Sequence, residues 1–167
     1  TFFMLPLTEQ QIRSSFINAS LRERKSLTLP SNFDELSWES LDFLGWRDEK
    51  LPLIGYVVTF LDGEPVGIIF RKAEGKTRSR PQCSWCEDIN LPNDVTFFNA
   101  RQAGPAGRNG DTISTLVCEK FECSVNVRTP QSLPYVGFDR EAAIAHRIQV
   151  LQDHVQNFTQ RVRDGEK

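Results

Sequence analysis

The sequence predicts an α+β fold, and three observations lead to it. Two segments rich in β-branched and aromatic residues, 53–60 and 66–70, flank the tight-turn pair Asp62-Gly63, which indicates a β-hairpin. Near the C-terminus, apolar residues recur at spacings of four, three, four, three and four, which is typical of one face of a helix. Four cysteines fall in two close pairs, which indicates a shared metal site better than four unrelated thiols.

The first expected element is a helix over 8–25. Thr8 can accept a hydrogen bond from a first-turn amide, and Gln11 can reach back to the Thr8 amide, which makes a capping box. Leu7 and Ile12 stand at the apolar positions that flank such a cap, and the mainly basic run 22–25 suits a helix C-terminus. A short helix near 34–44 is expected next.

The second half of the chain predicts another hairpin and a long helix. Val95 to Phe98 and Thr112 to Val117 read as two strands joined by a long Gly-rich connection, 104–110. Asp139 is a favoured N-cap for the final helix. We expect the apolar stripe of this helix to pack on the rest of the domain rather than on a coiled-coil partner. The stripe consists of Ile144, Ile148, Leu151, Val155, Phe158 and Val162.

Charge and hydropathy exclude several classes of protein. A formal net charge of −2 does not fit a strongly basic nucleic-acid binder. Charge is unevenly spread, because 31–50 is acidic and 71–80 is basic, which predicts two surfaces of opposite sign; two solvated loops are the alternative. No stretch approaches the ~18 apolar residues that span a membrane, and the N-terminus lacks secretion features, so we expect a cytoplasmic protein without a membrane partner.

The cysteine spacing favours one structural zinc ion. Cys83 and Cys86 are separated by two residues, Cys118 and Cys123 by four, and 31 residues lie between the pairs. Zinc prefers four thiolates at tetrahedral corners, and a two-residue gap lets a tight knuckle present two of them. Disulfides, unrelated buried thiols and a redox Cys-x-x-Cys are the alternatives. A reducing compartment disfavours disulfides, and a redox motif would leave the second pair unexplained.

The second pair follows a β-like run, and its members are one helical turn apart. A ligand at a strand end and another in the first turn of the next helix is the arrangement of a treble-clef finger. We therefore predict a treble-clef-type four-cysteine zinc finger within a small antiparallel β-sheet domain. An N-terminal helix at 8–25 and a long amphipathic helix at 139–164 should flank a β-rich zinc-binding core at 53–138, all in a single domain over 1–167.

Other polar residues near the cysteines have expected roles. Arg80, Lys120 and Arg128 are close in sequence to the ligands and could offset the formal −2 of zinc with four thiolates. His146 and His154 fall off the apolar stripe of the final helix, and we expect them to be exposed and not to be ligands.

At the two cysteine pairs the sequence resembles the C-terminal zinc-finger domain shared by the elongation factor G-binding proteins, the family that includes the FusB-type fusidic acid resistance proteins. Segments 41–48, 62–67 and 115–118 also look like stand-alone FBP-domain proteins of actinobacteria, and the resemblance covers about residues 5 to 165. It implies a treble-clef zinc domain that binds elongation factor G. In resistance members, this domain frees a factor stalled on the ribosome by fusidic acid.

The resemblance also implies partner contacts. Resistance members present an aromatic residue inside the first knuckle and basic or aromatic residues shortly before the second pair. Trp85 is the matching aromatic, although it could instead pack against the zinc core. The resistance proteins carry a separate N-terminal helical bundle, and only one helix is expected here, so factor binding with a housekeeping role is also open. The candidate partner-binding residues are Ser84, Trp85, Arg101, Arg108 and Asn109, with Arg78 and Arg80 from the basic run.

We thus expect a binding protein that acts on elongation factor G at the ribosome and relieves fusidic acid inhibition. The alternative is an RNA- or ribosome-binding zinc-finger protein with no resistance role, in which the basic run and Trp85 hold single-stranded RNA or rRNA. The sequence contains no H-E-x-x-H or G-x-S-x-G motif and no Gly-Lys-Ser/Thr after its Gly-rich loop. We therefore expect neither an enzyme nor a small-molecule substrate.

Overall fold

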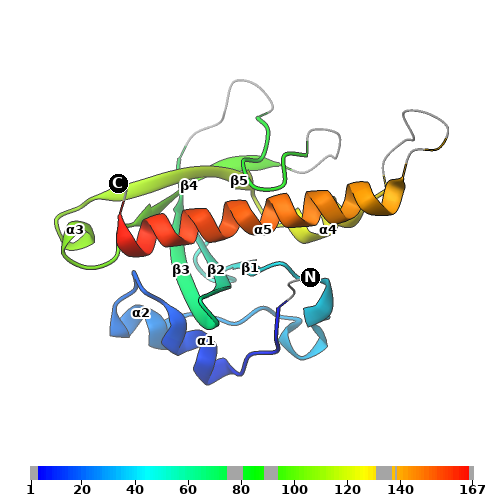
Figure 1. The fold of residues 1–167 in the computed structure, drawn as a ribbon. Helices are drawn as coiled ribbons and strands as arrows, with labels where there is room; N and C mark the ends of the chain where they lie inside the picture. The colour runs from blue at the N-terminus through cyan, green and yellow to red at the C-terminus, as the bar shows by residue number, and fades with distance from the viewer. Residues whose placement is uncertain (1–3, 75–80, 89–93, 131–136, 138, 166–167) are drawn as a thin grey trace.

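A computed structural model describes residues 4–74, 81–88, 94–130, 137 and 139–165 of the chain. These residues form an antiparallel five-stranded sheet in the order β1-β2-β3-β4-β5 (Figure 1). Helices α1 and α2 pack on one side of the sheet, and the long helix α5 packs on the other, which confirms the predicted α+β class. The strands are β1 (Leu44–Arg47), β2 (Ile54–Leu61), β3 (Glu64–Lys72), β4 (Val95–Arg101) and β5 (Thr112–Cys118). The helices are α1 (Glu9–Ser15), α2 (Leu21–Ser26), α3 (Pro105–Arg108), α4 (Cys123–Arg128) and α5 (Arg140–Asp164).

The N-terminal capping box is present as predicted. Gln11 N donates to Thr8 Oγ1 over 3.2 Å, and Thr8 N donates to Gln11 Oε1 over 2.8 Å. Leu7 and Ile12, which flank this cap, are both buried. The local sequence therefore determines where α1 begins.

The prediction of one helix over 8–25 is wrong, because the chain forms two short helices there. Phe16 is extended, and the next amide, Ile17 N, donates to Gly67 O of β3 over 3.0 Å. The Asn18 amide then donates to the carbonyls of Ile69 and Arg101. These contacts with the sheet replace helical hydrogen bonds, and α2 begins anew after its own capping box at Ser20.

The segment between α2 and β2 differs from the expected helix near 34–44. It contains two short 3₁₀ turns, Phe33–Glu35 and Trp38–Ser40, followed by β1. Two carboxylates of this acidic segment, Asp42 and Asp48, are buried. Asp42 and Asp48 therefore lie neither in a solvated loop nor on an exposed acidic surface, which were the two interpretations of this segment.

Both predicted hairpins are confirmed. In the first, Leu61 pairs with Glu64, and the turn residues Asp62 and Gly63 have φ of 52° and 80°. Positive φ at both central positions matches the right-handed twist of the flanking strands. In the second hairpin β4 pairs with β5 along its whole length, and α3 lies in the connection.

Helix α5 buries its apolar stripe, as the spacing predicts. Leu151, Val155, Phe158 and Val162 are buried in the cluster that fills the space between α5 and the sheet, and Ile148 packs against it. A second cluster, under α1 and α2, occupies the opposite face of β1 to β3. Within the described residues, no helix is both long enough and apolar enough to cross a membrane.

Candidate metal centre

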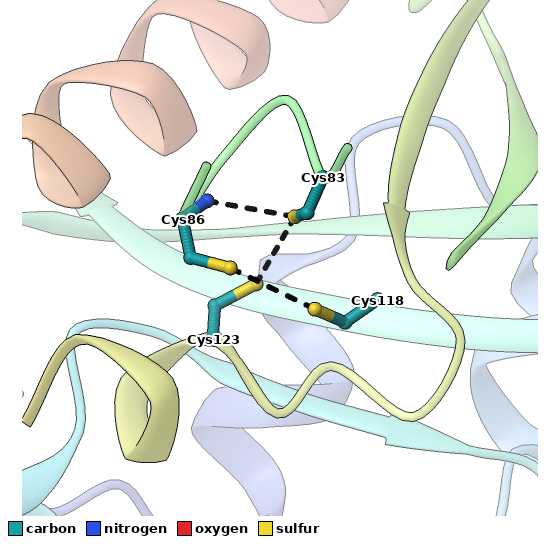
Figure 2. Close-up of side chains that lie close together, drawn as sticks. All are labelled: Cys83, Cys86, Cys118 and Cys123. Atoms are coloured by element: carbon teal, nitrogen blue, oxygen red, sulfur yellow. Dashed lines mark hydrogen bonds between the residues drawn. The ribbon is translucent and has the colours of Figure 1, made fainter. Parts of the chain in front are cut away.

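The four cysteines, although distant in sequence, converge on one point of the fold. Their sulfur atoms all lie within 4.8 Å of one another, and all four residues are buried (Figure 2). The Cys83 and Cys123 sulfurs are 3.6 Å apart, and those of Cys86 and Cys118 are 3.7 Å apart. A tetrahedron with metal–sulfur bonds of about 2.3 Å has edges of about 3.8 Å, so the donor set fits a tetrahedral metal ion.

The first pair lies in a tight knuckle between β3 and β4. Cys86 N approaches Cys83 Sγ at 3.5 Å, and Glu87 N donates to Cys83 O over 3.0 Å. Glu87 has a φ of 61°, which turns the chain back on itself. The knuckle is anchored to the sheet because Ser84 N donates to Leu116 O of β5 over 2.7 Å.

The second pair has the predicted strand-and-helix arrangement. Cys118 is the last residue of β5, and Cys123 is the first residue of α4. Between them Phe121 has a φ of 56°. Its ring packs where β1 and β2 have no side chain, since a Cβ built on Gly45 or Gly55 would lie 2.7 or 2.9 Å from Phe121 atoms. Two glycines thus let this turn lie directly on the sheet.

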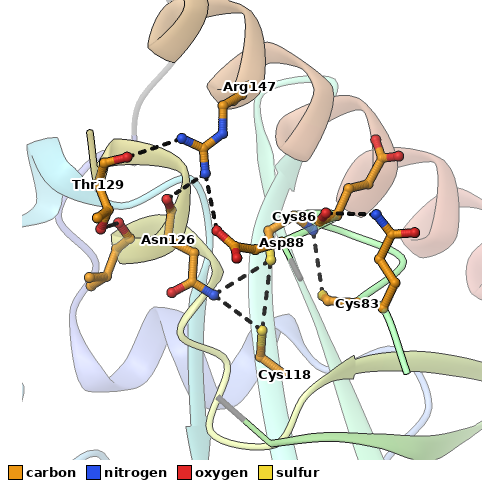
Figure 3. A network of polar contacts seen from close by, with 10 residues as sticks. Cys83, Cys86, Asp88, Cys118, Asn126, Thr129 and Arg147 are labelled. Atoms are coloured by element: carbon orange, nitrogen blue, oxygen red, sulfur yellow. Dashed lines mark hydrogen bonds and ion pairs between the residues drawn. The ribbon is translucent and has the colours of Figure 1, made fainter. Parts of the chain in front are cut away.

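Asn126, which was not among the predicted site residues, contributes hydrogen bonds to the cysteine cluster. Its side chain is buried, and Nδ2 lies 3.6 Å from Cys86 Sγ and 3.5 Å from Cys118 Sγ (Figure 3). An amide that donates to two sulfurs stabilises their thiolate form and holds one cysteine of each pair in place.

Arg147 of α5 joins the parts of the site together. Its guanidinium donates to the carbonyls of Asn126 and Thr129, at 2.7 and 3.1 Å, and forms an ion pair with Asp88 just after the knuckle (Figure 3). A cation at the C-terminal end of α4 also interacts favourably with the helix dipole. Knuckle, α4 and α5 are thereby fixed relative to one another.

The pKa values of the four thiols are shifted in opposite directions by their mutual hydrogen bonds. Hydrogen bonds from Cys118 and Cys123 hold the pKa of Cys83 far below its ordinary value. The pKa of Cys123 is raised well above its ordinary value, because its hydrogen bonds to Cys118 and Cys83 favour the protonated thiol. Without a metal, the cluster therefore ionises only in part, whereas a divalent cation would compensate the charge of all four thiolates.

Charge compensation was expected from Arg80, Lys120 and Arg128, and neither of the two that the structure describes forms a hydrogen bond with the sulfurs. Arg128 forms an ion pair with Asp42 instead, at 2.7 Å, and Lys120 is exposed. Arg80 lies outside the described residues. Among the described side chains other than the cysteines themselves, Asn126 is the one that directs a donor at the sulfurs.

The expectation that Trp85 offers an exposed aromatic surface is wrong. Trp85 is 2% exposed, and its ring packs edge-on against Phe43 and beside Phe158, at centroid distances of 5.3 and 5.9 Å. His154 is also not simply exposed: its Nδ1 lies 2.9 Å from Trp85 O. His146 is exposed, and neither histidine belongs to the cysteine cluster.

The other candidate contact residues lie in two separate places. Ser84 is exposed on the knuckle, whereas Arg101, Arg108 and Asn109 are exposed at the far tip of the β4–β5 ribbon. The strand register puts Arg101 opposite Thr112, six residues and about 20 Å from Cys118. Arg78 and Arg80 lie outside the described residues. The structure therefore does not gather these candidates into one patch.

Some of the missed residues could have been found from the sequence. Asn126 comes three residues after Cys123, which is one helical turn when a helix begins at that cysteine. Arg147 and Asp88 are 59 residues apart, and no local pattern links them. The buried carboxylate of Asp42, which accepts from Arg128 and Gln152, is likewise formed by segments far apart in the chain.

The fold and the cluster together define an α+β protein with a buried four-cysteine metal centre of the treble-clef type. The chain belongs to the FBP C-terminal treble-clef zinc-finger family, whose model matches residues 11–162. Among solved structures it is similar to the fusidic acid resistance protein FusC, with a TM-score of 0.56 and 19% sequence identity. That alignment covers 75% of this chain and 54% of FusC, so the chain spans about half the length of that protein. A search of curated proteins found no match.

Proposed function

We propose that this chain is a zinc-stabilised binding protein that acts on elongation factor G at the ribosome, in the cytoplasm, and relieves inhibition by fusidic acid. The observation that carries the proposal is the family match over residues 11–162, and the buried four-cysteine cluster supports it. The similarity in fold to a fusidic acid resistance protein supports the part of the proposal that concerns fusidic acid.

The metal in this proposal is a single zinc ion held by Cys83, Cys86, Cys118 and Cys123. Four thiolates form a soft donor set that suits zinc, and a complete set of protein ligands leaves no position for water or substrate. The metal would therefore stabilise the fold, and we propose a binding role rather than catalysis. A rigid scaffold lowers the conformational entropy lost on binding a partner.

The proposed contact surface is the exposed part of the β4–β5 ribbon. Arg101, Arg108 and Asn109 are exposed at its tip, and Phe97 of β4 keeps 46% of its surface exposed. Buried Trp85 takes no direct part in the contact. Its packing against Phe43 and Phe158 instead fixes the knuckle on the sheet, and with it Ser84.

The alternative is direct RNA binding, and one observation favours it. Phe97 shares the outer face of the sheet with Arg71 and Arg101, because the register places Arg71 beside Asn99 and alternate residues share a face. An exposed aromatic ring between cationic side chains can hold single-stranded RNA by stacking and charge. On the ribosome, such a surface could contact rRNA without any effect on resistance.

A binding experiment with purified elongation factor G tests the proposal. The zinc-loaded chain should bind the immobilised factor saturably, with or without ribosomes, and should restore translation inhibited by fusidic acid in a cell-free system. A salt titration separates the alternatives, since RNA binding weakens steeply with salt across unrelated sequences. Absence of binding to the factor in both settings would exclude the leading proposal, and salt-sensitive binding to RNA alone would favour the alternative.

A further inference from the structure

Part of the outer edge of β5 carries main-chain groups that have no partner among the described residues. Leu116 O points away from β4, because it accepts from Ser84 N at 2.7 Å. Phe97 O, on the paired residue of β4, points the other way and accepts from Ala73 N. Along a strand of an antiparallel pair, the main-chain N–H and C=O groups of successive residues point alternately toward and away from the partner strand. Thr112 and Ser114 are an even number of residues from Leu116, so their N–H and C=O groups also point outward. Among the described residues, no hydrogen-bond partner lies on them.

An open hollow adjoins the Thr112 end of this edge. It has a volume of about 1120 Å³, and Thr112 to Ser114 are among the residues that line it. The lining also includes the start of α3, the last turn of α5, Ile17 and Asp111, and the α5 turn contributes Arg161, Arg163 and Asp164. Figure 1 shows α3 and the C-terminal end of α5 at the same end of the molecule.

The chemistry of the edge specifies the kind of occupant. Outward N–H and C=O groups that repeat at every second residue are complementary to another extended polypeptide. The knuckle already uses the same edge in this way, through Ser84 N and Leu116 O. An RNA strand offers no matching repeat of amide donors, so the edge itself favours a peptide.

The charges beside the edge favour an acidic segment. Arg101 is exposed on the outer face opposite Thr112, and Arg108 is exposed at the end of α3. Neither guanidinium forms an ion pair within the described part of the chain. We propose that the β5 edge binds an extended, acidic segment of a partner protein as a sixth strand of the sheet. The inference does not depend on which protein supplies the segment.

The test replaces one outward N–H. Ser114→Pro removes this donor, and its own N–H is not part of the β4 pairing, so proline is tolerated there as on other edge strands. Ser114→Ala is the matched control, because both variants lose the hydroxyl that donates to Asn99 Oδ1. Thr112→Pro, at the first residue of β5, is a second variant if Ser114→Pro lowers the melting temperature.

The probe is a library of random twelve-residue peptides displayed on phage and selected on the immobilised, zinc-loaded chain. We expect the selected peptides to be acidic. A proline variant should raise the dissociation constant of each peptide about tenfold or more, which corresponds to the loss of one or two hydrogen bonds. Ser114→Ala should change it less than about twofold. Reversal of charge in Arg101→Glu with Arg108→Glu should weaken the same peptides.

Three results would overturn the inference. The first is that no peptide is selected, and the second is that the selected peptides bind the proline variants as tightly as the unchanged chain. The third is a dimer in light scattering of the chain alone that Ser114→Pro abolishes, since the edge would then be occupied by a second copy. Peptides that bind equally well after charge reversal would contradict the acidic preference.

Discussion

At one end of the β4–β5 ribbon Val95 pairs with Cys118, and at the other end Arg101 pairs with Thr112. The first end adjoins four buried sulfurs, and a buried amide directs its donors at two of them. The second end is exposed, and the outward main-chain groups of Thr112 and Ser114 have no hydrogen-bond partner in the part of the chain that the structure describes. From this comparison we infer that one ribbon separates two tasks: the metal-binding end holds the fold together, and the open end is available to a partner. Substitutions at the first end should therefore lower the stability of the fold, and substitutions at the second end should weaken binding.

Cys118→Ser should have the largest effect. The substitution removes one of four ligands, and metal binding is coupled to folding when thiolates hold distant segments together. We expect loss of the bound metal and of the cooperative thermal transition, measured by elemental analysis and circular dichroism. Thr112→Ser at the open end is the control and should leave both unchanged. A Cys118→Ser variant with native circular dichroism and melting temperature would show that the metal is not structural.

Asp42→Asn should have the next largest effect. The Asp42 carboxylate is fully buried and accepts two hydrogen bonds from Arg128, at 2.7 and 3.1 Å, and one from Gln152. Removal of one partner from a buried pair costs about 3–5 kcal/mol, because the remaining charge loses its compensation. Urea denaturation should show a loss near the lower figure, since Arg128 is partly exposed.

The control for Asp42 is Glu119→Gln. Glu119 pairs with Lys72 and Arg47, but all three side chains keep 20–27% of their surface exposed. Solvent screens such pairs, so we expect a loss of about 1 kcal/mol or less. The buried Asp42 carboxylate accepts from Arg128 of α4 and from Gln152 of α5, and so links these two helices. Equal losses for the two variants would contradict a special contribution of this link to stability.

Asn126→Leu should weaken metal retention more than it weakens the fold. Leucine has a similar size but cannot donate to Cys86 or Cys118, and loss of such a supporting hydrogen bond typically costs ~10–100-fold in metal affinity. The measurement is the rate of zinc transfer to a chromophoric chelator. Asn157→Leu, at an exposed position of α5, is the matched control. Equal transfer rates in the two variants would show that the Asn126 amide does not support the thiolates.

Asp48 predicts a smaller, pH-dependent effect. Burial alone would raise its pKa, but hydrogen bonds from Tyr56 and from the amides of Lys50 and Leu51 outweigh burial and lower the pKa below its ordinary value. The folded state therefore binds this proton less readily, so the carboxylate stabilises the fold above about pH 4 and less as the pH falls further.

The measurement for Asp48 is the difference in unfolding free energy between the unchanged chain and Asp48→Asn. The difference should shrink as the pH falls below about 4. Both proteins are compared only at pH values at which elemental analysis shows that they retain the metal, because the chain without metal is expected to have no cooperative transition. A difference that stays constant from neutral to acid pH would exclude this role for the carboxylate.

Features that depend on residues close together in the chain could be predicted from the sequence. The Thr8 capping box, the Asp62-Gly63 turn and the stripe of α5 depend on residues a few positions apart, so their pattern is visible in the sequence. The cysteine pairs were also visible, because two short spacings identify them as members of one site.

Features that depend on distant segments could not be predicted. The break after Ser15 results from contacts of Phe16 and Asn18 with strands far along the chain. The burial of Trp85 results from Phe43 and Phe158, which are far from it in sequence. In the first case a tertiary contact overrides a local preference for a helix. In the second, the sequence left both exposure and burial of Trp85 open, and only the fold decides between them.

Arg108→Ala combined with Asn109→Ala should have the smallest effect on stability and a clear effect on binding. Both side chains are exposed at the open end, and exposed substitutions usually change the free energy of unfolding by less than about 0.5 kcal/mol. If the tip contacts elongation factor G, the pair should still weaken binding to the factor, measured by calorimetry at fixed salt. The matched control is Arg22→Ala with Asn157→Ala, which removes the same side chains from exposed positions elsewhere. Equal affinity of the two double variants for the factor would show that the contact surface lies away from the tip. A large loss of stability in Arg108→Ala with Asn109→Ala would show that the open end also stabilises the fold.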